Sequence, residues 1–157
     1  MRKDLDWLAA RTAQAIITNT KSQDAGGVDN LTTKALGVLQ ENGVYAGLLY
    51  LYSRSESEQV IAKQIRTQLL HLTSELSLSP PTDRRVGNEL VVEDAKAGIA
   101  LKFLTDNVCS DLDSLLLVKQ IWEQTLIYAR YGAKAREAEE KAHEDEAKAR
   151  LAEEAKP

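Results

Sequence analysis

The amino-acid sequence predicts an all-α protein: a single-domain bundle of about six helices followed by a charged C-terminal tail. Apolar residues recur at three- and four-residue spacing along most of the chain, which is the period of an amphipathic helix. No segment shows a convincing strand pattern, and clusters of Gly, Pro and polar residues separate the periodic stretches. The 157 residues are 43% hydrophobic, enough to bury one core without a disulfide.

The first helix is expected to run from Asp4 to about residue 20. Asp4 is a good N-cap because its carboxylate can accept a hydrogen bond from an unpaired amide of the first turn. The following stretch, residues 21–30 (KSQDAGGVDN), contains Gly26 and Gly27 among polar residues. We therefore predict a loop there.

A second and a third helix are expected over residues 31–42 and 44–54. Between them lies the stretch LQENGVYAGLLYLYS (residues 39–53), whose Asn42-Gly43 pair is also typical of a two-residue hairpin turn. The flanking residues have helical spacing and do not alternate, so a hairpin is disfavoured. Gly43 is instead predicted to follow a helix C-terminus, at a positive φ that glycine adopts without steric cost.

A fourth helix is predicted from Ser55 to Leu76. Ser55 and Glu58 have the spacing of a capping box, in which each side chain satisfies an unpaired amide of the other residue. The segment that follows, residues 77–92, contains Pro80 and is the least helix-like part of the chain.

A fifth helix is expected over residues 93–107, and a last helix from a second capping box formed by Ser110 and Asp113. Its predicted apolar stripe comprises Leu112, Leu115, Leu116, Trp122, Thr125 and Ala129. We place the bundle domain at residues 1–132 and the charged tail at 133–157. The tail has few apolar side chains but has Glu-Lys pairs at four-residue spacing, so it could either prolong the last helix into solvent or fray.

Composition indicates a water-soluble protein of a reducing compartment. The single cysteine, Cys109, excludes an internal disulfide, the first residues lack the apolar region of a signal peptide, and no apolar run approaches the length of a membrane span. We expect a soluble, cytoplasmic protein. The net charge of −4 and pI near 5.3 argue against a surface that is basic all over.

Residues with catalytic potential are few, and the sequence predicts no enzyme, no catalytic residue, no metal site and no cofactor. His71 lies in the pattern of the fourth helix and His143 in the charged tail. Cys109 has no partner base in view, so a small, partly buried hydrophobe is favoured over a nucleophile. Asp111 and Asp113 resemble the carboxylates of a metal-dependent nuclease, but capping explains both more simply.

Basic and aromatic residues give the candidate binding surfaces. Local clusters of basic side chains could contact the phosphates of a bound strand, although a solvated face is the simpler interpretation for any one of them. The candidates for RNA contact are Arg54, Lys63, Arg66, Lys119, Arg130 and Lys134. The last three of them have spacings that place them near one side of the last helix, where Glu123 interrupts the row. The candidates for a protein interface are Trp7, Tyr45 and Tyr52, and Arg84-Arg85 could add a further phosphate contact.

Three stretches resemble a known family. They are "RTAQ" in the first helix, "TKALGVLQENGVYAGLLYLYSRS" around Asn42-Gly43-Val44, and the closing "IWEQTLIYARYGAKA" with Trp122. Together they resemble the small helical subunit of type III-B CRISPR effector complexes, the Cmr small-subunit family, over roughly residues 5–135. Residues 77–92 and the tail have no clear counterpart in that pattern.

The resemblance implies a non-catalytic helical bundle that takes part in antiviral defence. Copies would stack as a minor filament beside the other Cmr subunits, with basic faces touching the backbones of CRISPR guide RNA and target RNA. Two alternatives remain. One is a helical protein–protein interaction module that self-assembles without RNA, and the other is a metal-dependent nuclease, which requires carboxylates to converge from different helices.

Overall fold

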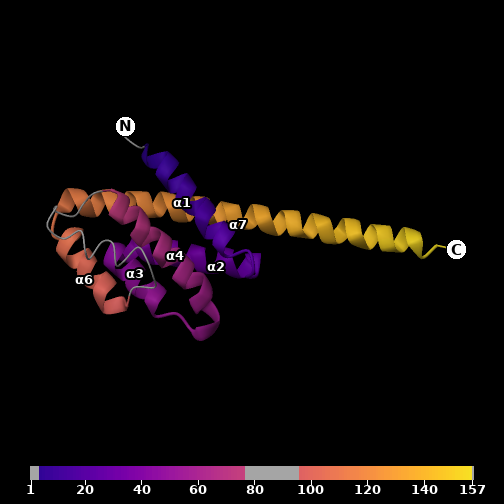
Figure 1. Cartoon of the computed structure of the whole chain (residues 1–157), viewed down its shortest axis with the longest axis horizontal. Helices are drawn as coiled ribbons and strands as arrows, with labels where there is room; N and C mark the ends of the chain where they lie inside the picture. The colour runs from indigo at the N-terminus through magenta and orange to yellow at the C-terminus, as the bar shows by residue number, and fades with distance from the viewer. Residues whose placement is uncertain (1–3, 77–95, 157) are drawn as a thin grey trace.

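The computed structural model describes residues 4–76 and 96–156, and within these ranges all regular structure is helical. The all-α prediction is confirmed (Figure 1). In chain order the helices are α1 (Leu5–Asn19), α2 (Ala25–Asn42), α3 (Val44–Tyr52), α4 (Glu56–Glu75), α6 (Ala97–Asn107) and α7 (Leu112–Glu154). The predicted loop over residues 77–92, Arg84-Arg85 and the first residues of the predicted fifth helix lie outside the described residues.

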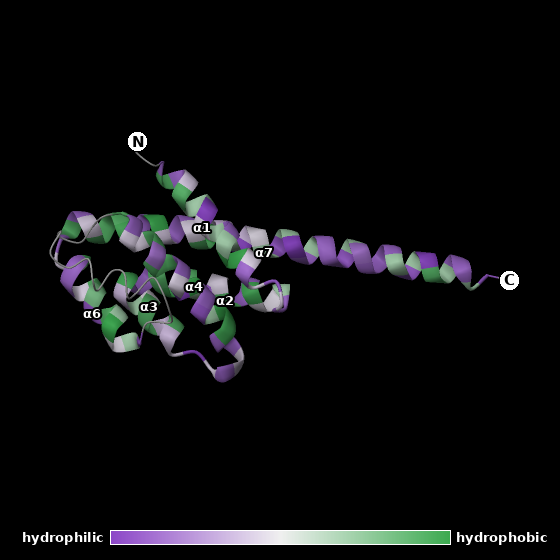
Figure 2. Cartoon of the chain, in the orientation of Figure 1, coloured by the Kyte–Doolittle hydropathy of each residue, from purple (hydrophilic) through white to green (hydrophobic). Residues whose placement is uncertain are grey.

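The long helix α7 is the element against which α1 and α2 pack. Its first half packs against α1 and α2, while α3 packs against α2, α4 and α6, and α4 also contacts α1. Hydrophobic residues gather where these helices meet, and the second half of α7 extends beyond them as a mostly hydrophilic helix with scattered apolar residues (Figure 2). The large side chains fully buried in the core include Ile16, Leu31, Leu39, Leu48, Leu51, Ile65, Leu69, Leu72, Leu104, Trp122 and Leu126.

The joint between α2 and α3 confirms the prediction for Gly43. This residue ends α2 and begins α3 with φ 94° and ψ −176°, a backbone conformation that is nearly restricted to glycine. Its amide donates to the carbonyl of Leu39 at 2.9 Å, and its own carbonyl accepts from Gly47 at 3.0 Å. One residue therefore closes one helix and opens the next.

The loop predicted over residues 21–30 is shorter than expected, because α2 begins at Ala25. The Asp24 carboxylate caps this helix by accepting a hydrogen bond from the Gly27 amide at 2.9 Å. Gly26 and Gly27 thus lie in the first helical turn. A good N-cap outweighs the low helix propensity of two glycines at this position.

Both predicted capping boxes need correction. Ser55 does occupy the N-cap of α4, but its side chain makes no capping hydrogen bond to the backbone. At α7 the N-cap is Asp111, whose carboxylate accepts from the amide and the hydroxyl of Ser114 at 3.0 and 2.7 Å. The prediction of Ser110 as the cap was wrong by one residue, because a carboxylate competes well for the same amides.

The apolar stripe predicted for the last helix is only partly the buried face of α7. Leu112 and Leu116 are 67% and 55% exposed, because their row points away from α1 and α2. The residues of α7 that are buried against the body are Val118, Ile121, Trp122, Thr125, Leu126, Ala129 and Ala133. Among them, Trp122 Nε1 donates a hydrogen bond to Thr73 Oγ1 at 2.9 Å, which links α7 to α4.

The charged tail prolongs the last helix, the first of the two alternatives that the sequence left open. We call residues 134–154 the arm, which spans about 31 Å at 1.5 Å per residue. Helix α7 passes through the predicted boundary at 132/133 without interruption, and Ala133 is buried. The packed part ends with Arg136, whose guanidinium donates to the carbonyls of Thr20, at 3.0 Å, and Gln23. From residue 138 to 156 every residue is exposed.

Candidate functional site

The six basic candidates for RNA contact do not lie on one face. Arg66 is 5% exposed, with its guanidinium 4.4 Å from the centroid of the Tyr52 ring. It donates to Gln59 Oε1 at 2.9 Å, and the amide group of Gln59 donates in turn to the carbonyls of Tyr52 and Arg54 at the end of α3. Arg66 thus stabilises a helix C-terminus inside the bundle, and its burial leaves no surface for a phosphate.

Arg54 is anchored to the same helix end. Its guanidinium lies 3.7 Å from the centroid of the Tyr50 ring, its Nε donates to the Tyr50 carbonyl at 3.1 Å, and Nη1 lies 3.7 Å from Glu58 Oε2. These contacts hold the side chain against the α3–α4 corner. Lys63 is exposed one helix further along, on α4.

The remaining three candidates share one stripe of α7. Lys119 Nζ lies 3.4 Å from the Gln40 carbonyl and 3.8 Å from Glu123 Oε1, and Arg130 Nε lies 3.7 Å from Asp29 Oδ1. The side chains of Lys119 and Arg130 are 35% and 37% exposed. A long pair at a surface contributes little to stability, so a phosphate could replace Glu123 beside Lys119 at small cost. Arg130 Nε is itself buried, so a phosphate would contact the exposed part of the Arg130 side chain.

Lys134 extends this stripe by one turn and is exposed. Lys119, Arg130 and Lys134 therefore form the α7 basic stripe. It follows the side of α7 that faces α2, since Gln40 and Asp29 lie near the two ends of that helix.

The three aromatic candidates also separate. Trp7 on α1 is 51% exposed with Arg11 stacked 4.9 Å from its ring, and Tyr45 on α3 is 41% exposed. Tyr52 is half-buried against the core beneath Arg66. Two aromatic side chains on different helices are thus available for a protein contact.

Residues with catalytic chemistry lie apart from one another. Cys109 is exposed, so the prediction of a partly buried side chain was wrong. Desolvation by neighbouring atoms still raises the pKa of its thiol, which disfavours the reactive thiolate. Hydrogen bonds from Ser114 lower the pKa of the Asp111 carboxyl, as expected for an N-cap. His71 Nδ1 lies 3.1 Å from Glu75, and across residues 4–76 and 96–156 no group of three His, Cys, Asp or Glu side chains could hold a metal ion.

An open groove of about 520 Å³ lies between α1 and α7. Small and apolar side chains, including Ala10, Ala13, Ile17 and Gly132, form most of its lining. Tyr128, also in the lining, donates from its hydroxyl to Asp6, and this hydrogen bond raises the pKa of the phenol. Its polar lining residues are Gln14, Thr18 and Tyr128, and the described lining holds no charged side chain that could orient an ionic substrate.

Sequence reasoning missed the contacts made by Arg11, Gln59 and Arg136. Arg11 on α1 forms an ion pair with Glu75 on α4, and Arg136 binds the connection between α1 and α2. Each of these contacts joins residues far apart in the chain or beyond one helical turn, so no local spacing predicts it.

None of the described helices has the length and apolar character needed to cross a bilayer.

Comparison with known proteins gives no family assignment. Neither a protein-family model, nor a curated protein, nor a solved structure matches this chain significantly.

Proposed function

We propose that this protein is a non-catalytic small subunit of an RNA-guided effector ribonucleoprotein of the type III-B CRISPR kind. In this role, copies of the bundle stack beside larger subunits and help to hold guide and target RNA through backbone contacts. Sequence specificity then belongs to pairing between guide and target, and the basic side chains of this protein would contact phosphates, which carry no sequence information.

One observation carries this proposal: the stretches that resemble the small-subunit family form one packed unit. The α2–Gly43–α3 joint and the Trp122 half of α7 lie far apart in the sequence, yet α2 packs along α7. Leu39 and Leu48 on either side of the joint are buried, as is Trp122. The similarity therefore lies at positions that determine how the helices pack.

The α7 basic stripe is the RNA-contacting surface in this proposal. Its side chains are partly exposed, and its two ion pairs, with Glu123 and Asp29, are longer than a hydrogen bond. Phosphates of a bound strand would replace Glu123 beside Lys119 and contact the exposed part of the Arg130 side chain. Because the contacts are electrostatic, binding should weaken steeply as salt is added.

Affinity purification of the tagged protein from its native host tests the assembly. We expect several larger subunits and short guide RNAs with repeat-derived 5′ ends to be recovered with it. Recovery of the protein without RNA, or with unrelated partners, contradicts the proposal.

A triple variant tests the RNA surface within the assembled complex. Lys119→Ala with Arg130→Ala and Lys134→Ala should weaken target RNA binding and reduce the slope of log affinity against log salt by about 2, given a contribution of about 0.7 per phosphate contact with a single strand. The control variant carries Lys21→Ala, Lys96→Ala and Lys102→Ala, which remove the same charge at exposed positions elsewhere. Equal salt slopes for the two variants would reject the stripe.

The exposed aromatics favour a second candidate function, a helical protein–protein interaction module without RNA. Trp7 and Tyr45 are 51% and 41% exposed, and aromatic residues of this kind are enriched at protein interfaces. If this candidate is correct, Trp7→Ala and Tyr45→Ala abolish recovery of protein partners, while the α7 stripe variant recovers them normally.

A further inference from the structure

The arm consists of three consecutive seven-residue repeats. Residues 134–140 read KAREAEE, residues 141–147 read KAHEDEA and residues 148–154 read KARLAEE. Each repeat begins with Lys-Ala, has Ala or Asp at its fifth position and Glu at its sixth. A repeat of seven residues places the second and fifth positions on one face of a helix, where they correspond to positions a and d of a coiled coil.

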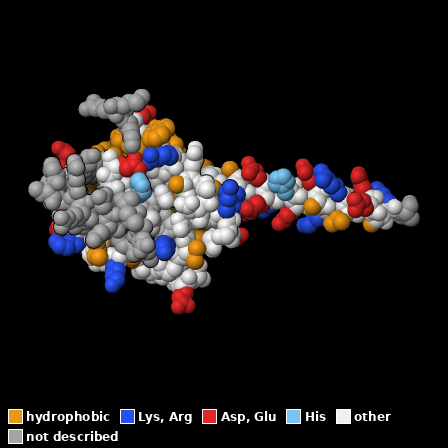
Figure 3. Space-filling view, in the orientation of Figure 1, with side chains coloured by type: hydrophobic (Ala, Val, Ile, Leu, Met, Phe, Trp, Pro, Cys, Tyr) orange, Lys and Arg blue, Asp and Glu red, His pale blue; other side chains and the backbone are white. Residues whose placement is uncertain are grey.

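This face of the arm has no partner among the described residues. We call it the arm seam, and every one of its members is exposed: Ala135, Ala138, Ala142, Asp145, Ala149 and Ala152. Tyr131, one d position earlier in the same register, is 63% exposed at the base of the arm. The arm carries side chains of both charges and projects well clear of the packed bundle (Figure 3).

The body does not obstruct this face. On α7, Ala129 and Ala133 are fully buried against the bundle, whereas Tyr131 between them is exposed. The bundle therefore lies on the opposite side of α7 from the arm seam. Two arms could pair along their seams with the two bodies held apart on the outside.

The charges that flank the seam select one orientation for such a pair. The g positions hold Lys134, Lys141 and Lys148, and the e positions hold Glu139, Glu146 and Glu153. In a parallel pair each g residue faces an e residue of the partner, so all contacts join Lys to Glu. In an antiparallel pair g faces g and e faces e, so every flanking contact would be repulsive.

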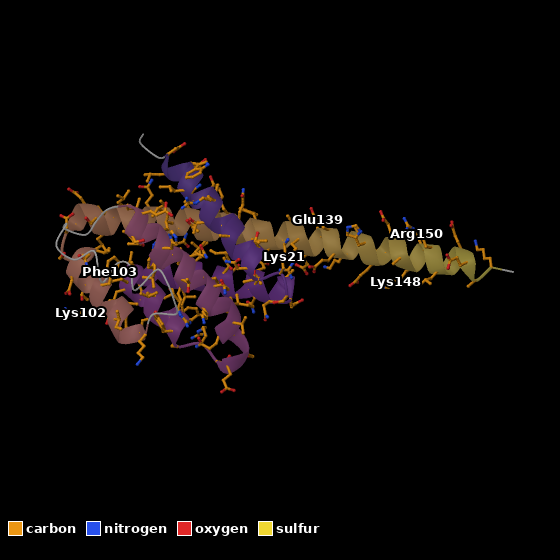
Figure 4. The ribbon with its side chains drawn as sticks, viewed as in Figure 1. Lys21, Lys102, Phe103, Glu139, Lys148 and Arg150 are labelled. Atoms are coloured by element: carbon orange, nitrogen blue, oxygen red, sulfur yellow. The ribbon has the colours of Figure 1, made fainter. Side chains whose placement is uncertain are left out.

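We propose that the arm forms a parallel, in-register two-stranded coiled coil with the arm of a second copy of this chain, from Tyr131 to Ala152. The partner is a second copy because the charge pattern complements itself in that orientation. The proposal rests on the arm alone and does not depend on RNA binding by the body. In Figure 4, Glu139 and Lys148 project from a part of the arm beside which no other helix lies.

The pairing should be weak and adjustable. Alanines at a and d bury far less apolar area than Leu or Ile would, and Asp145 places a carboxylate at a central d position. Within one chain, Lys141 Nζ also lies 3.4 Å from Glu137 Oε1, a contact that competes for the lysine. The structure thus fits a contact that forms when copies are concentrated by a larger assembly.

Site-specific cross-linking of the full chain tests both contact and orientation. In a Cys109→Ser background, Ala149→Cys places a thiol on the seam, and Leu151→Cys places one in the same repeat on the opposite face. We expect disulfide-linked dimers to form much faster with Ala149→Cys than with Leu151→Cys. Equal rates, or no dimer from either variant at millimolar concentration, would overturn the proposal.

Charge exchange gives a test that does not depend on cysteine chemistry. Changing the three g lysines to Glu, or the three e glutamates to Lys, makes all six flanking contacts of a homodimer repulsive. Each variant should self-associate about a hundredfold more weakly than the parent in sedimentation equilibrium. Mixing the two should restore association, because each then complements the other.

Asp145→Ala tests the seam by gain of association. Removing two facing carboxylates and completing the alanine seam should strengthen dimerisation, while the matched change Asp113→Ala, outside the arm, should leave it unchanged. No restoration on mixing the charge variants, together with no gain from Asp145→Ala, would show that the arm acts as a single solvated helix.

Discussion

At the scale of single residues, glycine, capping side chains and buried arginines determine how the chain turns. Gly43 is the residue on which the sequence was most informative: its neighbours have helical spacing, and it adopts the positive φ that a helix joint needs. Arg66 shows the opposite case. Its charge indicated a surface, but the structure buries it over Tyr52, where it satisfies the end of α3 through Gln59.

Gly43 and Gly37 form a matched pair for testing the joint. A Cβ added at either residue meets no atom within 4 Å, so substitution by alanine changes only backbone preference. Gly43→Ala should lower the free energy of unfolding by about 1–3 kcal/mol, because alanine is strained at φ 94°. Gly37→Ala, inside α2, should raise it by about 0.5–1 kcal/mol. Urea unfolding followed by circular dichroism measures both, and an unchanged stability for Gly43→Ala would contradict the positive φ.

At the scale of helices, periodicity predicted which segments are helical but not where each begins or which face is buried. Helix α2 begins at Ala25 because Asp24 caps it, although Gly26 and Gly27 favour a loop. In α7 the apolar row through Leu112 and Leu116 is exposed, because α1 and α2 cover a different row. Contacts between helices then determine stability, and the indole of Trp122 bonded to Thr73 is one of them.

Thr73→Val tests this link between α4 and α7. The substitution keeps the shape of the side chain but leaves the buried Trp122 N–H without its acceptor, so it should cost about 1–3 kcal/mol of stability. Thr125→Val is the control, since the Thr125 hydroxyl is also buried but donates to the Ile121 carbonyl of its own helix, at 2.8 Å. We expect that change to be close to neutral. Equal losses in urea unfolding would show that the indole hydrogen bond contributes nothing.

At the scale of the whole molecule, charge and packing divide α7 into two parts. Residues 137–156 hold eight acidic and four basic side chains, a net charge of −4, which is the net charge of the full chain. The remainder of the chain is therefore neutral overall, and any RNA surface on it must be local. This acidic segment repels phosphates, so a bound strand would leave α7 near Lys134.

Removal of the exposed end of α7, from residue 141 onwards, should not destabilise the bundle. Deleting residues 141–157 should leave the melting temperature unchanged at low protein concentration, because every residue from 141 to 156 is exposed. In contrast, Arg136→Ala should lower it by about 5 °C, since the charged hydrogen bonds to Thr20 and Gln23 are lost. Differential scanning calorimetry distinguishes the two, and a large drop on deletion would mean that the deleted segment packs against the bundle.

The sequence by itself determined three features: that this chain is helical, that α2 and α3 are joined at Gly43, and that the tail has too few apolar side chains to form a core. These features depend on neighbours within one or two helical turns, so periodicity and glycine placement reveal them. Only the tertiary structure decided that Arg66 is buried, that the stripe of Lys119, Arg130 and Lys134 lies beside α2, and that Arg136 anchors the base of the arm. Those outcomes depend on which helix faces cover one another. Contacts between residues that are distant in the sequence determine this, and no local pattern records them.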